Sequence, residues 1–265
     1  MKETISSSTG RRSAILQILK QNSNISVTEL SKKFGVSEVT IRKDLNLLKE
    51  RNLLVRTRGG AILHETRKDD NDTSIRFKKL ANFREKQAIG RAAANLIKEG
   101  DTIIIDSGTT ALQVACNLHR FRNLTIITNA LNVAQEVLAY KRFNVILLGG
   151  NIRNASESVV GALAESNLKM FYCDKLFLGV DSFSIDNGLS TPNVEEANIN
   201  QIMISRSREV IAVFDSSKVN KRALAFITTL DKIDRIVTDD SMDKTTRNQL
   251  KAMNVEVITV KADPV

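Results

Sequence analysis

The stretch VSEVTIRKDLNLLKERNLLVRTRGGA, residues 36–61, combines a helix start, an amphipathic helix and two short apolar runs. Ser37 belongs to the residue types preferred at an N-cap, and Val36 before it can pack on Ile41 as a hydrophobic staple. From Ile41 onward, apolar residues recur every three or four positions, which is the spacing of one helix face. The pattern predicts a helix that starts at Glu38 and exposes its first turn.

The residues on either side of this helix complete a small domain. Two shorter helical stripes precede it, within residues 11–34, and Gly35 supplies the turn between the second and third helices. The run LLVRTRGGAIL, residues 53–63, reads as two strands joined at Arg58, Gly59 and Gly60. Three helices followed by a hairpin predict a winged helix-turn-helix.

The first turn of the third helix and the hairpin supply the candidate DNA-binding residues. A helix presented by its first turn can enter the major groove, and arginines in a neighbouring hairpin can contact phosphates or a minor groove. The candidates are Ser37, Val39, Thr40, Arg42, Lys43, Arg56, Arg58 and Gly59. The alternative is a three-helix domain with a solvated basic face. We favour DNA binding because the cap, turn glycine, apolar stripe and basic hairpin occur together in the expected order.

The charge of the chain is concentrated near its start. The formal net charge is +9, yet residues 1–68 hold 14 Lys and Arg against 6 Asp and Glu, which leaves 25 against 24 in the remainder. Such asymmetry predicts a basic module that meets an anionic partner, joined to a body that does not. A length of 265 residues suits one ordinary domain plus this smaller module.

Several classes of protein are disfavoured by the sequence. No run approaches the roughly 20 apolar residues of a spanning helix, and the start MKETISSSTG lacks the apolar segment of a signal peptide, so a cytoplasmic location is expected. Cys116 and Cys173 are 57 positions apart, and although His119 follows Cys116 by three positions, no second pair of ligands with zinc-site spacing accompanies them, so the sequence predicts two buried thiols and no metal site.

A second domain follows a polar segment. Residues 64–74, HETRKDDNDTS, are predicted as a linker, and residues 74–98 as one helix ending before Gly100. Beyond it, apolar β-branched runs alternate with helical stretches; the runs are TIIID, LTIIT, FNVILLGG, KLFLGVD, EVIAVFD, DRIVTDD and VEVITV. This alternation predicts a mostly parallel sheet covered by helices on both faces, the α/β class.

Polar residues follow five of these strands where they end. Ligands of open parallel sheets bind beyond the carboxyl ends of the strands, so we expect one crevice there. The candidate effector-binding residues are Asp106, Ser107, Gly108, Thr109, Thr110, Thr128, Asn129, Gly150, Asp181 and Lys218. Gly108 would let a ligand approach the backbone at a helix start, where free N–H groups favour a phosphate.

Simpler interpretations remain for some of these residues. Ser107 and Thr109 can cap a helix without binding any ligand, and Lys218 can be an ordinary surface lysine. Glu195 and Glu196 follow Pro192 at an apparent helix start, where they can serve the helix dipole alone, so Glu196 is not included among the candidates.

The residues also resemble a known family. The segment RRSAILQILKQNSNISVTELSKKFGVSEVTIRKDLNLLKERNLLVRTRGGA is similar to the N-terminal signature of DeoR-family bacterial transcription regulators, and the resemblance continues through DSGTT, TN, LLGG, GVDS and DSSK. Within that family, GLSTPNVEEANINQIMI and DSSKVNKRALAFITTLDKIDRIVTDD resemble the amino-sugar regulators of the N-acetylgalactosamine repressor type.

The resemblance implies a fold and a function. It implies that residues 1–63 bind operator DNA, and that residues 75–265, beyond the linker 64–74, form a sugar-phosphate sensor resembling ribose-5-phosphate isomerase. The expected protein is a repressor without a cofactor, acting as a homodimer or homotetramer. An isomerase carrying an accessory basic domain is the alternative, and Asp106 and Asp181 keep it open because proton transfer on a sugar needs a carboxylate.

Overall fold

The computed structural model describes residues 8–22, 24–51, 53–57, 59–63 and 75–262. They divide into two compact units, a smaller one up to Arg84 and a larger one over Glu85–Ala262. The segment 64–74, predicted as the linker, lies outside the described residues, and the helix that follows it clusters with the smaller unit. The domain limits 1–63 and 75–265 therefore stay a prediction.

The smaller unit is a winged helix-turn-helix, as predicted. Its helices are α1 (Ser8–Asn22), α2 (Val27–Phe34) and α3 (Glu38–Glu50). Its antiparallel sheet has the order β1-β3-β2 and consists of β1 (Asn24–Ser26), β2 (Leu54–Thr57) and β3 (Gly60–Leu63). Strand β1 was not predicted from the sequence, because a three-residue strand is too short to show an alternating pattern.

Local interactions fix the ends of the two central helices. Ser26 and Glu29 form a capping box at the start of α2, and Gly35 ends that helix in the left-handed region at φ 64°. Ser37 accepts a hydrogen bond from the Thr40 backbone N–H, which confirms it as the N-cap of α3. Val36 is partly buried against the core of this unit.

The predicted single helix over residues 74–98 is wrong. The structure has two helices instead, α4 (Ile75–Leu80) and α5 (Phe83–Ala94). Asn82 between them adopts φ 50°, a left-handed conformation that asparagine tolerates and that no helix can continue through. The Asn82 side-chain oxygen also accepts a hydrogen bond of 3.1 Å from Gln17 of α1.

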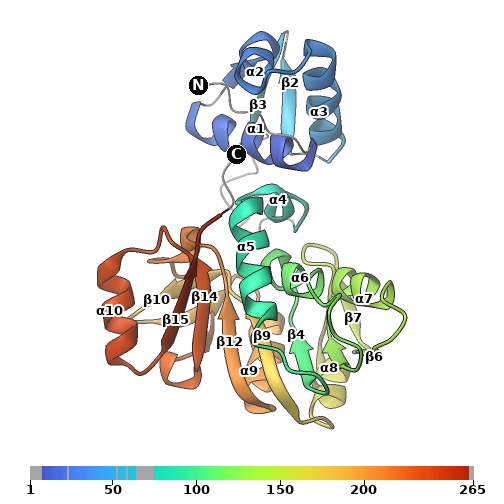
Figure 1. Ribbon diagram of the computed structural model, residues 1–265, viewed down its shortest axis with the longest axis vertical. Coiled ribbons are helices and arrows are strands. Elements are labelled where there is room, and N and C mark those ends of the chain that lie inside the picture. Colours follow the sequence, from blue (N-terminus) through green and yellow to red (C-terminus); the bar gives the residue numbers. More distant parts are fainter. Residues whose placement is uncertain (1–7, 23, 52, 58, 64–74, 263–265) are drawn as a thin grey trace. The chain divides into compact units, whose positions relative to one another are not determined.

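The larger unit is built on a seven-stranded sheet in the order β15-β14-β12-β9-β4-β5-β6 (Figure 1). All neighbouring pairs are parallel, which confirms the predicted class. The strands match the seven apolar runs: β4 (Thr102–Ile105), β5 (Thr125–Thr128), β6 (Asn144–Leu147), β9 (Cys173–Gly179), β12 (Ser207–Val213), β14 (Arg235–Asp239) and β15 (Glu256–Val260).

Successive residues of each strand point to opposite faces and so build two cores. Ile103 and Ile105 of β4 pack with α5, α6 (Thr109–Ala115) and α7 (Leu131–Leu138). Ile104 packs on the other face with α8 (Ala162–Leu168), α9 (Val194–Ser205) and α10 (Lys244–Ala252). Helices therefore cover both faces of the sheet, as a parallel arrangement requires.

Short elements outside the main sheet were not predicted. Two small antiparallel sheets and two 3-10 turns lie in its connections: β7 (Asn151–Arg153) with β8 (Ser158–Val160); β10 (Ser182–Ser184), β11 (Gly188–Thr191) and β13 (Ala225–Thr228); and the turns η1 (Ser216–Lys218) and η2 (Leu230–Lys232). Their strands have three or four residues each, too few for a period to stand out.

The two cysteines differ in burial. Cys173, at the start of β9, is buried as predicted, whereas Cys116 is half-buried because it follows the last turn of α6. Burial raises the pKa of Cys116 to about 11 and that of Cys173 to about 12, so both thiols are protonated at neutral pH.

Candidate DNA-binding surface and effector site

The first two turns of α3 expose the predicted DNA-binding side chains. Val39 is 59% exposed and Lys43 is exposed, while Ser37 and Thr40 share a side-chain contact of 3.0 Å at the helix start. An apolar side chain this exposed at a helix start suits contact with a thymine methyl group. The surface thus offers apolar, hydroxyl and cationic groups together.

The wing is attached to α3 by Arg56. Its Nη1 donates to Asn46 Oδ1 at 2.7 Å, and its Nε donates to the Gly60 carbonyl at 3.2 Å. These bonds give Arg56 a role that the sequence analysis missed, the placement of the hairpin against the helix. Gly59 is exposed at φ 92° in the turn, and the predicted residue Arg58 lies outside the described residues.

A buried ion pair holds α1 against α3. Asp44 is 3% exposed, and its Oδ2 accepts a hydrogen bond of 2.6 Å from Arg11 Nε. Arg12 Nε lies 3.8 Å from the other carboxylate oxygen. Two of the basic residues counted near the start of the chain therefore contact a carboxylate. Asp44 could have been found in the sequence, since it lies beside Leu45 of the apolar stripe.

In the larger unit, the order of the strands reverses between β4 and β9. The chain runs from β4 through β5 to β6, then crosses to β9 on the other side of β4 and continues to β12. A crevice forms beyond the carboxyl ends of two such strands. Here the two ends are in close contact, because a Cβ added at Gly179 would lie 2.6 Å from the Ser107 carbonyl oxygen.

Asp106 lies at this reversal point. It is 2% exposed, its Oδ2 accepts a hydrogen bond of 3.1 Å from the Gly179 N–H, and its Oδ1 is buried without a hydrogen-bond partner. Burial, followed by repulsion from Glu196 and Asp181, raises the pKa of Asp106 to about 8. The group is therefore a neutral acid at pH 7, able to donate a hydrogen bond.

The other predicted effector residues lie at neighbouring strand ends. Gly108, at φ 109°, is the N-cap of α6, and that helix start has no side-chain cap bond, so Ser107 and Thr109 do not act as simple caps. The remaining residues range from fully buried to exposed: Thr128 and Asn129 (both 0% exposed), Thr109 and Thr110 (both 7%), Ser107, Asp181 and Lys218 (half-buried) and Gly150 (exposed).

Glu196, which the sequence analysis left out, belongs to the same cluster. The Thr191 hydroxyl lies 3.2 Å from both Glu196 Oε2 and Asp181 Oδ2, and Arg153 Nη1 donates to Glu196 Oε1 at 3.3 Å. Glu196 is 7% exposed, which a carboxylate serving only the helix dipole would not be. The strand ends thus bring the carboxyl groups of Asp106, Asp181 and Glu196 close together.

Lys86 is a second functional candidate that was not predicted from the sequence. It is 3% exposed on α5, and its Nζ lies 3.8 Å from Asp215 Oδ2, at the end of β12. Its signal in the sequence was its position, because Lys86 occupies the same helical stripe as Ile89 and Ala93. A lysine is expected on such an apolar stripe only where it has a partner.

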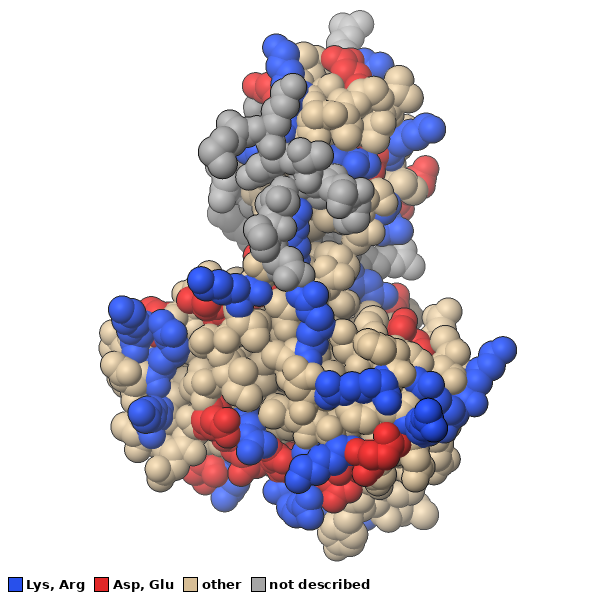
Figure 2. All heavy atoms as spheres, viewed as in Figure 1, with Lys and Arg blue, Asp and Glu red and all other residues tan. Residues whose placement is uncertain are grey.

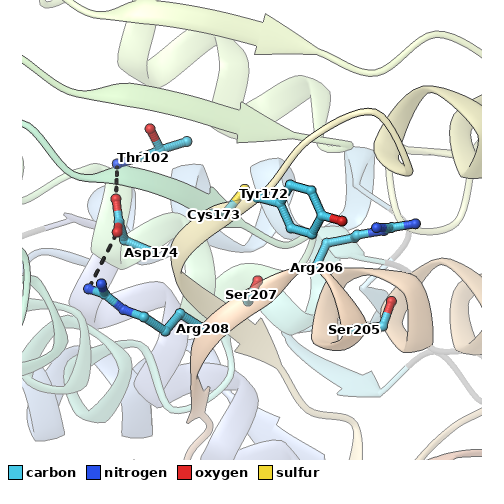
Figure 3. A pocket seen from close by; sticks show the side chains of 8 residues that line it. All are labelled: Thr102, Tyr172, Cys173, Asp174, Ser205, Arg206, Ser207 and Arg208. Carbon is cyan, nitrogen blue, oxygen red and sulfur yellow. Dashed lines mark hydrogen bonds and ion pairs between the residues drawn. The ribbon is translucent and has the colours of Figure 1, made fainter.

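A separate hollow of about 350 Å³ lies at the opposite edge of the sheet, where β4, β9 and β12 begin (Figure 3). Figure 3 shows Asp174 joining the Thr102 backbone N–H, at 2.9 Å, and the Arg208 guanidinium, at 3.4 Å. The lining contains none of the predicted effector residues, so the hollow is distinct from the polar cluster at the strand ends.

Acidic and basic side chains are mixed over the larger unit, on the face that Figure 2 shows. This mixture agrees with the near balance of 25 basic and 24 acidic residues after residue 68. Within the described ranges, the structure has no helix with the length and apolar character needed to cross a membrane.

Family models match both parts of the chain. A model described as the DeoR-like helix-turn-helix domain matches residues 11–67, and one described as the DeoR C terminal sensor domain matches residues 81–240.

Curated relatives match along nearly the whole chain. The "Putative aga operon transcriptional repressor" of Escherichia coli O157:H7 is 34% identical over 98% of this chain and 96% of its own length. The glycerol-3-phosphate regulon repressor of Escherichia coli K12 is 34% identical over 87% of this chain and 90% of its own length. The transcriptional repressor GlcR of Bacillus subtilis 168 is 32% identical over 94% of this chain and 95% of its own length.

Among solved structures, ribose 5-phosphate isomerase A of Methanocaldococcus jannaschii aligns with a TM-score of 0.40 at 16% identity. The alignment covers 54% of this chain and 56% of that chain.

Proposed function

Since the chain belongs to the DeoR family of transcriptional regulators, we propose that it represses a sugar-metabolism operon and responds to a phosphorylated sugar. The relatives named above are regulators, so the chain is a regulator rather than an isomerase with an accessory domain. One observation carries the proposal: the exposed α3 start and the buried polar cluster at the strand ends occur in the same chain.

For DNA binding, we propose that α3 enters the major groove. Val39, Thr40, Arg42 and Lys43 would contact base edges and phosphates, with the wing beside them. Arg56 would act by holding the wing in place, in view of its bonds to Asn46 and Gly60. Helix-turn-helix operators usually repeat with the symmetry of the protein, which supports a homodimer or homotetramer acting on DNA in the cytoplasm.

For the effector, we propose a site beyond the carboxyl ends of β4 and β9, where the polar side chains cluster. The Gly108 backbone and the Thr109 and Thr110 hydroxyls would bind the phosphate, and Lys218 would add a positive charge. The carboxyl groups of Asp106, Asp181 and Glu196 would bind sugar hydroxyls. The name of one relative supports a small phosphorylated effector, because it refers to the glycerol-3-phosphate regulon.

Effector binding would change DNA binding by linkage. A ligand shifts the population of DNA-binding protein only by the difference between its affinities for the two arrangements. Lys86 supports α5 as part of this coupling, because it joins that helix to the end of β12 through Asp215. In the sequence, α5 follows α4, and both follow the winged helix-turn-helix.

The proposal is tested with duplex sites that the full chain selects from a randomised pool. Affinity for a selected site is measured with and without a panel of hexose, hexosamine, pentose and triose phosphates. One class should change the affinity. Gly108→Val and Lys218→Ala should leave operator binding intact and abolish or weaken that response, Gly108→Val more strongly because valine is strained at φ 109°.

Lys244→Ala is the matched control, since it removes an exposed lysine from α10. Circular dichroism confirms that each variant folds. A folded Gly108→Val protein that responds at wild-type effector concentrations would place the effector site elsewhere. A wild-type protein that selects no sequence would refute the DNA-binding part.

A further inference from the structure

Glu38, the first residue of α3, forms a small network on the DNA-binding surface. Arg42 lies one helical turn after Glu38, and its Nη2 donates to Glu38 Oε2 at 2.8 Å. The Thr28 hydroxyl of α2 donates to Glu38 Oε1 at 2.8 Å. Each carboxylate oxygen is therefore engaged, one by the recognition helix and the other by the preceding helix, so the carboxylate is fixed in position.

This network is not explained by the stability of the fold. The side chains of Arg42 and Glu38 are 56% and 39% exposed, and an exposed pair one helical turn apart contributes little to stability. The cap of α3 is already supplied by Ser37. A negative charge on a surface that meets phosphates also opposes DNA binding in general. Glu38 also lies in the first turn of α3, where a negative charge favours the helix whether or not Arg42 and Thr28 contact it. The network of contacts itself therefore points to a role at the DNA-binding surface.

We infer that Glu38 is a specificity-determining residue, which positions Arg42 to read a base edge and keeps its guanidinium from a phosphate. The inference rests on the proposed DNA binding. Arginine discriminates between bases when its guanidinium is held for a bidentate contact with guanine. An arginine that is free to rotate forms hydrogen bonds with any nearby phosphate. Such bonds raise the affinity for every sequence and do not discriminate between sequences.

The charge of Glu38 acts in the same direction. It offsets the positive charge of Arg42, so this pair adds little to non-specific attraction while the protein is away from its site. Glu38 also repels a phosphate that comes close in a wrong register, and its oxygens can accept a hydrogen bond from a cytosine amino group. Thr28 contributes by restricting the rotation of the carboxylate.

The test compares Glu38→Gln with Glu50→Gln in the full chain. Glu50 is exposed at the other end of the same helix, so its substitution makes the same change in charge away from the network. Each protein selects duplexes from a randomised pool. Dissociation constants are then measured for the site that the wild type selects and for an unrelated duplex of equal length, at several salt concentrations.

Glu38→Gln should bind the unrelated duplex severalfold more tightly, with a salt dependence steeper by about one phosphate contact. Its preference for the selected site over the unrelated duplex should fall roughly tenfold, within the range of one base contact. Thr28→Val should lower that preference by a smaller factor. Glu50→Gln should keep it.

Two results would overturn the inference while leaving the proposed function intact. One is a Glu38→Gln variant that prefers the selected site over the unrelated duplex as strongly as the wild type does. This result would mean that the contact between Arg42 and Glu38 is lost when the protein binds DNA. The other is an equal loss in Glu50→Gln, which would make charge alone responsible. Thermal unfolding of each variant confirms that the small unit is folded. A wild-type protein that selects no sequence would instead refute the proposed function.

Discussion

The raised pKa of Asp106 predicts how the stability of the larger unit depends on pH. An ordinary aspartate has a pKa of 3.8, whereas that of Asp106 is about 8, mainly because of burial. Between these two values the folded protein binds one proton that the unfolded chain does not. The free energy of unfolding must therefore fall as pH rises from about 4 to 8, and this contribution stays constant at higher pH.

The size of the effect follows from the two pKa values. Between pH 5 and pH 9 the carboxyl group of Asp106 lowers the free energy of unfolding by up to about 4 kcal/mol, at about 1.4 kcal/mol for each pH unit below 8. Asp106→Asn has nearly the same shape and cannot ionise. The variant should gain stability over the wild type as the pH is raised.

Urea unfolding of the full chain at pH 5, 7 and 9, followed by circular dichroism, measures this difference. Wild type and variant share all other titrating groups. The pH dependence of the difference between their free energies of unfolding therefore reports on Asp106 alone. Asp186→Asn is the control, because Asp186 is exposed and its substitution should keep the wild-type pH dependence. A gap between Asp106→Asn and wild type that is constant from pH 5 to pH 9 would refute the reasoning.

Two further substitutions test contacts within each unit. Asp44→Ala should destabilise the smaller unit by about 3 to 5 kcal/mol, because it leaves Arg11 buried without its carboxylate; a loss under about 1 kcal/mol in thermal unfolding would contradict this. Gly179→Ala should cost about 1 to 3 kcal/mol in urea unfolding, since its Cβ would press on the Ser107 carbonyl; wild-type stability would mean that the two strand ends separate freely.

The sequence was most informative where a pattern repeats or a cap residue has one main use. Ser37, Gly35 and the apolar stripe of α3 located the recognition helix, and seven β-branched runs located the seven parallel strands. These patterns depend on residues close together in the sequence, so they can be recognised without knowledge of the tertiary structure. The polar residues that follow parallel strands were brought to one edge by topology alone.

Features that depend on contacts between distant residues could not be predicted in this way. Arg56 reads as a phosphate contact in sequence, yet its bonds go to Asn46 and Gly60. Asn82 interrupts a helix that its neighbours would support. Glu196 and Lys86 differ from surface residues only through their burial beside Thr191 and Asp215 respectively, and burial is a property of the folded chain.

The strand order of the smaller unit has a consequence for how the chain folds during synthesis. β3 is the central strand, and both β1 and β2 pair with it. The ribosome releases β3 last of the three, so neither pairing can form until residues 60–63 have emerged. In this sequence 202 residues follow residue 63, and most of them are still untranslated when it emerges. A nascent chain therefore presents a completed winged helix-turn-helix well before the unit proposed to control it exists.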